Sequence, residues 1–243
     1  MNREKIAAYY DSQALRKLQD FVVRNKRVER GWQLIVDCGG TPSRILEIGC
    51  GVGSICWRMS QRHPASEVIG VDFSQGNLAI AERVFKSPNV AFVLTDGTSD
   101  FQFGRFDLIV LMDVYEHVAV EERRALHANL RKSLTESGRI LLTFPTPRHL
   151  AWLRANEPNE IQPVDENISP EVVAALASDV ERDVLVYREV DVWRAGDYAH
   201  AVVGSSLFPA PAPRRAVGRI NRLTEILGRR ARLRRVTKAG IHF

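Results

Sequence analysis

At 243 residues, with 45% apolar and 26% charged residues, the chain has the composition of a soluble globular protein with a sizeable core. It contains no apolar run of the roughly 18 residues that a membrane span needs, and its N-terminus has no apolar stretch of the kind found in secretory signals. The net charge of +5 is unevenly spread, because nine arginines, one lysine and one acid give the segment 214–243 a charge of +9 and leave the rest at −4.

Two helices are predicted between residues 3 and 38 from apolar residues at three- and four-residue spacing, and Gly39-Gly40 ends the second. We interpret residues 1–40 as an N-terminal helical cap. A basic cluster between the two helices is expected to lie in solvent, and the alternative is a contact with an anionic substrate or with the carboxylate of a cofactor. The cluster consists of Arg24, Lys26, Arg27 and Arg30.

Strands and helices then alternate. Strands are predicted at 45–48, 68–72, 90–94, 106–112 and 139–144, and helices at 54–62, at 75–86 after the N-cap Ser74, and from Val120 to Leu134, the last closing at Gly138. Near-continuous runs of β-branched residues are typical of a parallel sheet that is buried on both faces. Two further runs, 184–193 and 198–204, flank Ala195-Gly196-Asp197 and predict a hairpin. The predicted fold is α/β, a doubly wound, mostly parallel seven-stranded sheet with an antiparallel C-terminal hairpin.

Residues 145–170 break this alternation with five prolines, and a helix follows at about 170–179. A long insertion at the carboxyl edge of a sheet is where loops often carry recognition, so we assign it to substrate binding within a catalytic domain of residues 41–206.

The end of the chain, 207–243, reads as a linker with Pro209, Pro211 and Pro213, followed by a basic amphipathic helix. Its apolar residues recur at helical spacing. Three interpretations stay open: docking on the body or on a partner subunit such as a second copy, with the arginines in water; contact with an anionic membrane surface; or contact with nucleic acid. The apolar residues are Val217, Ile220, Leu223, Ile226, Leu227 and Leu233.

The segment from Arg44 to Ile55, R-I-L-E-I-G-C-G-V-G-S-I, is a strand that runs into a glycine loop, a nucleotide-type binding element. A dinucleotide fingerprint would need glycine where Ser54 stands, and Glu47 would repel a pyrophosphate. A ligand with a cationic group instead favours Glu47. S-adenosylmethionine has an ammonium, a sulfonium and an adenosine, and it lacks phosphate.

Four segments now occur in the order and spacing of one family: E-I-G-C-G-V-G, V-I-G-V-D-F-S, F-D-L-I-V-L-M-D-V-Y-E-H-V and R-I-L-L-T-F-P. Over residues 40–145 the chain therefore resembles a class I S-adenosylmethionine-dependent methyltransferase, close to the small-molecule group. The resemblance implies S-adenosyl-L-methionine as cofactor, with Glu47 near its ammonium and Asp72 on its ribose hydroxyls. The remaining implied contacts are Gly49, Cys50 and Gly51 beside the methionyl part, Phe73 and Asp96-Gly97 at adenine, and the backbone carbonyls of Met112 and Asp113 facing the methionyl amine.

Methyl transfer to a hydroxyl needs a general base, whereas a neutral amine does not. His117 is the first candidate, in an E-H pair that borders the active site of similar enzymes, although it could simply order the next helix. His149 and Tyr10 follow, each with a structural alternative at the surface or in the core, and Tyr9 is a weaker candidate. Asp165 and Glu166 could orient an acceptor.

The favoured acceptor is a hydroxyl or amine of a small molecule such as a sugar or a secondary metabolite. The hypothesis of an RNA acceptor depends only on the arginine-rich tail, so the sequence disfavours nucleic acid without excluding it. A protein acceptor and a non-catalytic scaffold are weaker hypotheses still. The three cysteines, Cys38, Cys50 and Cys56, lack metal-ligand spacing. We therefore expect reduced thiols, no metal and a cytoplasmic location.

Overall fold

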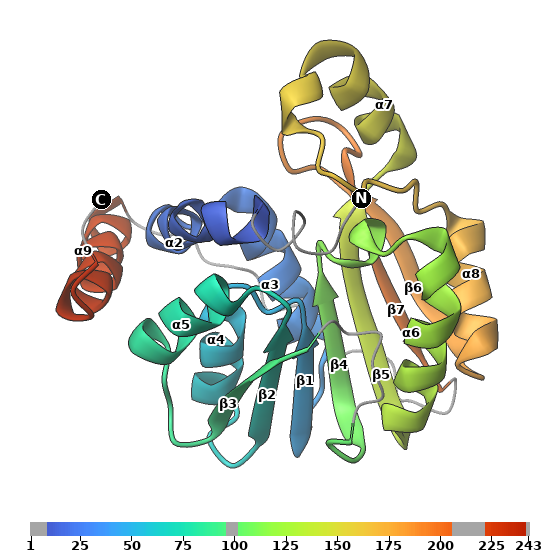
Figure 1. Ribbon diagram of the computed structural model, residues 1–243, viewed down its shortest axis with the longest axis horizontal. Helices are drawn as coiled ribbons and strands as arrows, with labels where there is room; N and C mark the ends of the chain where they lie inside the picture. The colour runs from blue at the N-terminus through green and yellow to red at the C-terminus, as the bar shows by residue number, and fades with distance from the viewer. Residues whose placement is uncertain (1–8, 96–101, 206–221, 242–243) are drawn as a thin grey trace.

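The computed structural model describes residues 9–95, 102–205 and 222–241. Its centre is one seven-stranded sheet in the order β3-β2-β1-β4-β5-β7-β6, drawn in Figure 1. Five strands are parallel and form its core. β7 runs antiparallel to both β5 and β6, so the predicted C-terminal hairpin closes one edge. The strands are β1 (Arg44–Ile48), β2 (Glu67–Asp72), β3 (Val90–Leu94), β4 (Phe106–Met112), β5 (Leu134–Pro145), β6 (Asp183–Val190) and β7 (Tyr198–Gly204).

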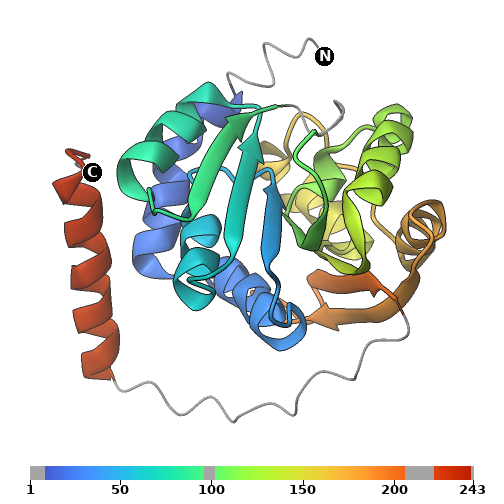
Figure 2. The same ribbon diagram turned by 90° about the horizontal axis from the view of Figure 1, so that it is seen from below.

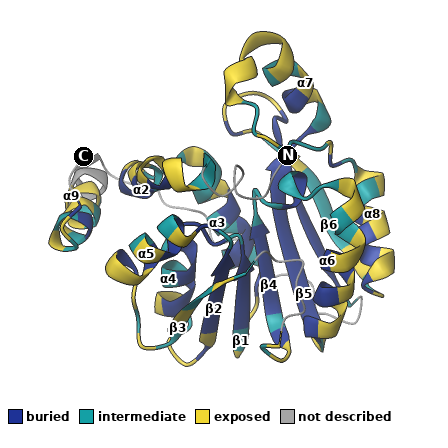
Figure 3. Cartoon of the chain, viewed as in Figure 1, coloured by how far each residue is buried: buried dark blue, intermediate teal, exposed yellow. Residues whose placement is uncertain are grey.

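Both faces of the sheet are covered by helices, as the continuous apolar strands require. Alternate residues of β1 show this: Leu46 packs in the layer with α6 and α8, and Ile45 packs in the opposite layer with α3, α4 and α5. Figure 3 shows the resulting buried centre and the exposed outer faces of the helices. The helices are α2 (Ala14–Val23), α3 (Lys26–Cys38), α4 (Ser54–Arg62), α5 (Gln75–Val84), α6 (Val120–Ser133), α7 (Pro147–Asn156), α8 (Pro170–Asp179) and α9 (Arg222–Lys238).

Most predicted boundaries are confirmed within two residues, and local chemistry explains two of them. Ser74 caps α5, because its side chain accepts a hydrogen bond from the Asn77 amide. Gly39 follows the last residue of α3 as its C-cap, as the Gly39-Gly40 pair predicts.

The predicted closure of the helix α6 at Gly138 is wrong. α6 ends at Ser133 and the chain is already extended from Leu134, which pairs with Phe106 of β4. Leu134 is buried in the core, and the Thr135 hydroxyl donates a hydrogen bond of 3.1 Å to Asp107. The predicted helix end at Leu134 is thus right within one residue, and the strand begins five residues before the predicted 139 because Leu134 is buried in the sheet.

Two other segments differ from expectation. The insertion begins with a full helix, α7, which has a proline at its first position, and a single turn at Pro158–Glu160 follows it. β6 ends at Val190 instead of residue 193. Asp197 explains this early end, because its carboxylate accepts hydrogen bonds from the backbone amides of Val192, Trp193 and Arg194 and so folds residues 191–197 into a compact loop.

Candidate functional site

The glycine loop joins β1 to α4 at the carboxyl edge of the sheet. Gly49, Gly51 and Gly53 all have positive φ angles, of 67°, 54° and 83°, which side chains rarely adopt. A Cβ atom on Gly49 would collide with the side chain of Val114 from the loop after β4. The loop is therefore a bare backbone surface that a ligand can approach closely.

Glu47 lies on β1 beneath this loop and on the wall of the central cavity. It is 3% exposed and accepts a hydrogen bond of 2.8 Å from the Cys56 thiol. Burial raises the pKa of Glu47 to about 8. A cation placed in the cavity would favour the ionised form, so this buried carboxyl group suits a positively charged ligand.

Asp72 ends β2, and its carboxylate accepts hydrogen bonds from the backbone amides of Gly51 at 2.7 Å and Ser74 at 2.9 Å. These bonds tie the glycine loop to the start of α5. Phe73 packs edge to face on the ring of Tyr10, with ring centroids 5.2 Å apart. The two predicted adenine contacts, Asp96 and Gly97, lie outside the described residues.

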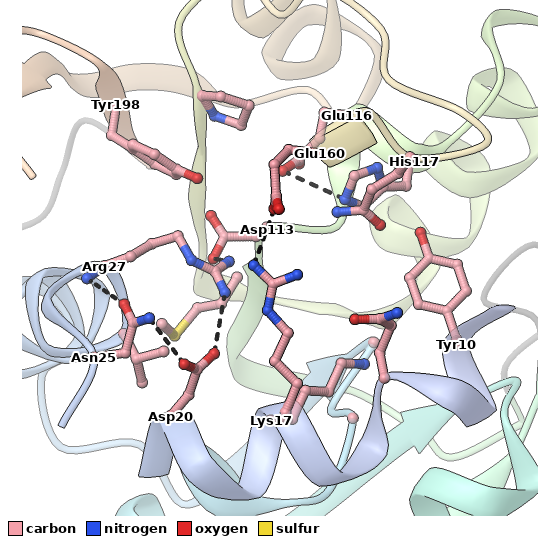
Figure 4. Close-up of a pocket in the computed structure, with 18 of the residues that line it drawn as sticks. Tyr10, Lys17, Asp20, Asn25, Arg27, Asp113, Glu116, His117, Glu160 and Tyr198 are labelled. Atoms are coloured by element: carbon pink, nitrogen blue, oxygen red, sulfur yellow. Dashed lines mark hydrogen bonds and ion pairs between the residues drawn. The ribbon is translucent and has the colours of Figure 1, made fainter. Parts of the chain in front are cut away.

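A cavity of about 500 Å³ opens above this loop, between the N-terminal helical segment and the insertion. Figure 4 shows part of its lining. It brings together predicted residues from five separate segments, whereas Asp72 and Phe73 lie beside its wall. The predicted residues on the wall are Tyr10, Glu47, Gly49, Cys50, Gly51, Met112, Asp113, His117 and His149.

His117 is held in one orientation by the insertion. Its Nδ1 lies 2.7 Å from the carbonyl oxygen of Val164 and 3.1 Å from a carboxylate oxygen of Asp165. Because a carbonyl only accepts, Nδ1 carries the hydrogen, and in the neutral ring the lone pair belongs to Nε2. Burial lowers the pKa of His117, but the carboxylates of Glu116 and Asp165 outweigh it, so the pKa is raised.

Glu116 precedes His117 and is almost fully buried on the cavity wall. Burial raises its pKa to about 8. One carboxyl oxygen lies 3.8 Å from Nε2 of His117, and the other has no hydrogen-bond partner among the described residues. A buried polar atom without a partner is costly, so a ligand that donates a hydrogen bond here would be favoured.

The other two predicted catalytic residues also reach the cavity. The Tyr10 ring lies between Phe73 and His117, 6.1 Å from the imidazole centroid. Burial, with added repulsion from Glu116 and Asp165, raises the pKa of Tyr10, so its hydroxyl is a proton donor at neutral pH. His149 on α7 packs near Tyr198, and burial lowers its pKa, so its ring is neutral.

The prediction that the whole basic cluster lies in solvent is wrong for Arg27. Its guanidinium points into the cavity, forms an ion pair with Asp113 and lies 4.0 Å from Asp20 (Figure 4). Asn25 caps α3 by accepting a hydrogen bond from the Arg27 amide, and this places Arg27 in the first turn of the helix. The sequence offered one signal for this position of Arg27: it is the second residue of a helix whose start lies beside the predicted site.

Sequence reasoning missed Lys17 and Tyr198. Lys17 extends from α2 over the glycine loop: a Cβ atom built on Gly51 would lie 3.2 Å from Nζ. Burial lowers the pKa of Lys17, and within the described part of the chain Nζ has no hydrogen bond or ion pair. Tyr198 begins β7 beside Pro145 and lines the same cavity.

Comparison with known proteins agrees with this geometry. The sequence model of the methyltransferase domain family matches residues 45–138. The chain is 32% identical over 110 residues to demethylmenaquinone methyltransferase of Thermus thermophilus, which covers 44% of this chain and 49% of that protein. It is 29% identical over 173 residues to trans-aconitate 2-methyltransferase of Methylobacterium nodulans, with 67% of this chain and 64% of that protein covered.

Solved structures share the fold. Magnesium protoporphyrin IX methyltransferase from Synechocystis, determined with bound S-adenosylhomocysteine, superposes with a TM-score of 0.64 at 18% identity over 84% of this chain and all of that one. The matched regions span 49% and 64% of the lengths of these two curated relatives. None of the described helices is long and apolar enough to cross a membrane, and no three described His, Cys, Asp or Glu side chains are grouped to hold a metal.

Proposed function

We propose that this chain, whose residues 45–138 match the sequence model of the methyltransferase domain, is a class I S-adenosylmethionine-dependent methyltransferase. In this proposal it transfers a methyl group from S-adenosylmethionine to a hydroxyl or amine of a small molecule. The observation that carries the proposal is the single cavity of about 500 Å³ that joins the glycine loop to His117. One end offers a bare backbone with Glu47 and Lys17, and the other offers an oriented imidazole.

The donor end fits a zwitterionic amino-acid group. Glu47 is a buried carboxyl group that gains from a nearby ammonium, and Lys17 is a partly buried ammonium that gains from a carboxylate. We assign the donor's ammonium to Glu47 and its carboxylate to Lys17. Gly49 and Gly51 present backbone on the cavity wall beside its methionyl chain, and Phe73 offers a flat face next to Asp72 for the nucleoside.

S-adenosylmethionine supplies a methyl group on a positively charged sulfur, so the transfer needs positioning more than activation of the donor. His117 takes the proton from an acceptor hydroxyl at Nε2, while Val164 and Asp165 keep the proton at Nδ1 in place. The unpaired oxygen of Glu116 accepts a hydrogen bond from the acceptor. Tyr10 covers the reacting region from the N-terminal side and helps to exclude water.

A small acceptor is supported by the shape of the site. The insertion and the N-terminal segment meet above the cavity, where Arg16 of α2 and Glu160 form an ion pair of 3.0 Å. Two of the relatives are named as methyltransferases of demethylmenaquinone and of trans-aconitate, which are small molecules. We place the acceptor among sugars or secondary metabolites that present a hydroxyl or an amine.

Two measurements test this function. Isothermal titration should detect binding of S-adenosylhomocysteine and no binding of NAD, and binding of NAD alone would overturn the donor assignment. The protein is then incubated with methyl-tritiated S-adenosylmethionine and a cell extract separated into metabolites, RNA and protein. Label in the metabolite fraction that disappears with His117→Ala supports the proposal. Label confined to RNA would establish a nucleic-acid methyltransferase instead.

A further inference from the structure

The C-terminal helix α9 packs on the body through an unexpected set of contacts. Docking on the body through apolar residues is one of the three interpretations of the sequence, yet Leu227 is 61% exposed and Leu233 is 39% exposed. Outside the described side chains lie the other apolar residues named for this segment, Val217, Ile220, Leu223 and Ile226. Val236 is fully buried among α2 and α5 residues, and the arginines at 232 and 235 donate hydrogen bonds to the carbonyl oxygens of Val22 and Val84. The docking face is therefore partly made of arginines.

Arg235 makes this docking specific. Its guanidinium lies 4.2 Å from the ring centroid of Trp57 on α4, a distance typical of a cation–π contact. Arg83 of α5 donates a hydrogen bond to the carbonyl oxygen of Ala239, just beyond the helix. Figure 2 shows α9 lying along one side of the molecule, with α2 next to it. One face of the helix is thus fixed against the body, and the opposite face is fixed outward.

The outward face carries a row of cations. Leu227, Arg230, Arg234 and Lys238 follow one another at three- and four-residue spacing, so they share one side of the helix, and all four are exposed. We call these four residues the basic strip. Within the described residues no carboxylate pairs with its three cations, and the sequence of α9 contains one acid, Glu225. The strip therefore presents at least three uncompensated positive charges along about three helical turns.

We propose that the basic strip binds an anionic lipid surface, with the helix lying flat on the membrane. Charge complementarity requires a polyanion, and the exposed leucines at 227 and 233 favour a lipid interface, where apolar side chains enter the headgroup region. Leu15 and Val23 are also exposed, on α2, the helix against which α9 packs. The described part of the outward face has no aromatic side chain that could stack on bases, which disfavours single-stranded nucleic acid.

The size of the effect follows from the charges. Each basic residue near an anionic bilayer strengthens binding by about fivefold, so loss of all three cations should weaken it by about a hundredfold. The attraction should also fall as salt is raised, because exposed charges are screened over about 8–10 Å at physiological ionic strength.

The test is vesicle co-sedimentation of the full chain with phosphatidylcholine vesicles that contain or lack 30% phosphatidylglycerol. The strip variant is Arg230→Gln/Arg234→Gln/Lys238→Gln. The matched control removes the same charge from the α6 side of the molecule. It is Arg105→Gln/Arg124→Gln/Lys132→Gln. Thermal melts of both variants verify that each is folded.

We expect the wild type to sediment with the anionic vesicles only, the control to remain within about threefold of it, and the strip variant to lose about a hundredfold. Failure of the wild type to sediment, equal binding to neutral vesicles, or an equal loss in the control would overturn the proposal. A filter-binding assay with total RNA is the second arm. Tighter binding to RNA than to vesicles, lost in the strip variant, would assign the strip to nucleic acid and refute the lipid interpretation.

Discussion

Replacing Lys17 with methionine tests the donor end of the cavity most directly. Lys17 is partly buried, lies directly above Gly51 and has no hydrogen bond or ion pair among the described residues. A ligand carboxylate that reaches Nζ would form a charge-assisted hydrogen bond, which is worth about 1.5–3 kcal/mol in proteins. We therefore expect Lys17→Met to weaken binding of S-adenosylhomocysteine by about 10- to 150-fold.

The assay is isothermal titration at pH 7.5 with S-adenosylhomocysteine and with its decarboxylated analogue, which keeps the ammonium and the adenosine. The wild type should prefer the intact ligand, and Lys17→Met should bind both ligands about equally, because the preference depends on the ammonium of Lys17. Methionine keeps the length and the apolar stem of lysine, so the packing over the loop is retained. Lys86→Met, at an exposed lysine beyond α5, is the control and should retain the preference.

Two results would refute this assignment. If Lys17→Met weakens both ligands by the same factor, Lys17 acts on the structure of the site and not on the carboxylate. If the variant binds both ligands more tightly, the lysine blocks the cavity and competes with the donor. A variant with no preference but normal binding of the analogue would support the assignment.

Three other perturbations report on separate parts of the molecule. The folded pKa of Glu47, about 8, exceeds its unfolded value of about 4.5, so its stabilising contribution is complete below about pH 4.5 and is lost as pH rises through 8. Urea unfolding at pH 6 and 9 should therefore show a smaller loss of stability for Glu47→Gln than for the wild type. An identical loss in both proteins would contradict this role of Glu47. Asp165→Asn should lower the pKa of His117 in an NMR titration of the imidazole, because it removes a carboxylate at 3.1 Å, and an unchanged pKa would mean that Asp165 does not set it. Val236→Ala should increase hydrogen exchange in α9 while α6 stays protected, since loss of two buried methyl groups costs about 1–2 kcal/mol, and unchanged exchange in α9 would show that Val236 does not hold the helix.

The strands and the glycine loop could be read from the sequence because their causes are local. A nearly continuous apolar run such as that of β4 suits a strand buried on both faces, whatever its neighbours are. Ser74 forms its cap with an amide three residues away, and Gly51 marks a backbone of positive φ by its identity alone. Where the cause was not local, as at Leu134, the start of a strand was misplaced: β5 begins at Leu134 and not at residue 139.

The cavity residues divide in the same way. His117 and Asp113 follow a recognisable strand, so their position at the carboxyl edge was predictable. The orientation of His117 was not, because Val164 and Asp165 reach it from an insertion almost fifty residues away. The direction of Lys17 and Arg27 depends on how α2 and α3 pack across the sheet edge, and a basic residue on a helix has the same sequence signature in solvent and in a cavity.

The C-terminal helix shows most clearly what the sequence alone determines and what the tertiary structure decides. Its sequence alone determined that a basic helix would follow a proline-containing linker, because helical spacing and charge are properties of the segment itself. Only the tertiary structure decided which arginines face inward. Trp57 and the carbonyl of Val84 offer Arg235 a cation–π contact and a hydrogen bond, whereas Leu227 stays largely exposed to solvent. The buried face of a helix is selected by the partners that the fold presents to it, and those partners lie more than 140 residues earlier in the chain.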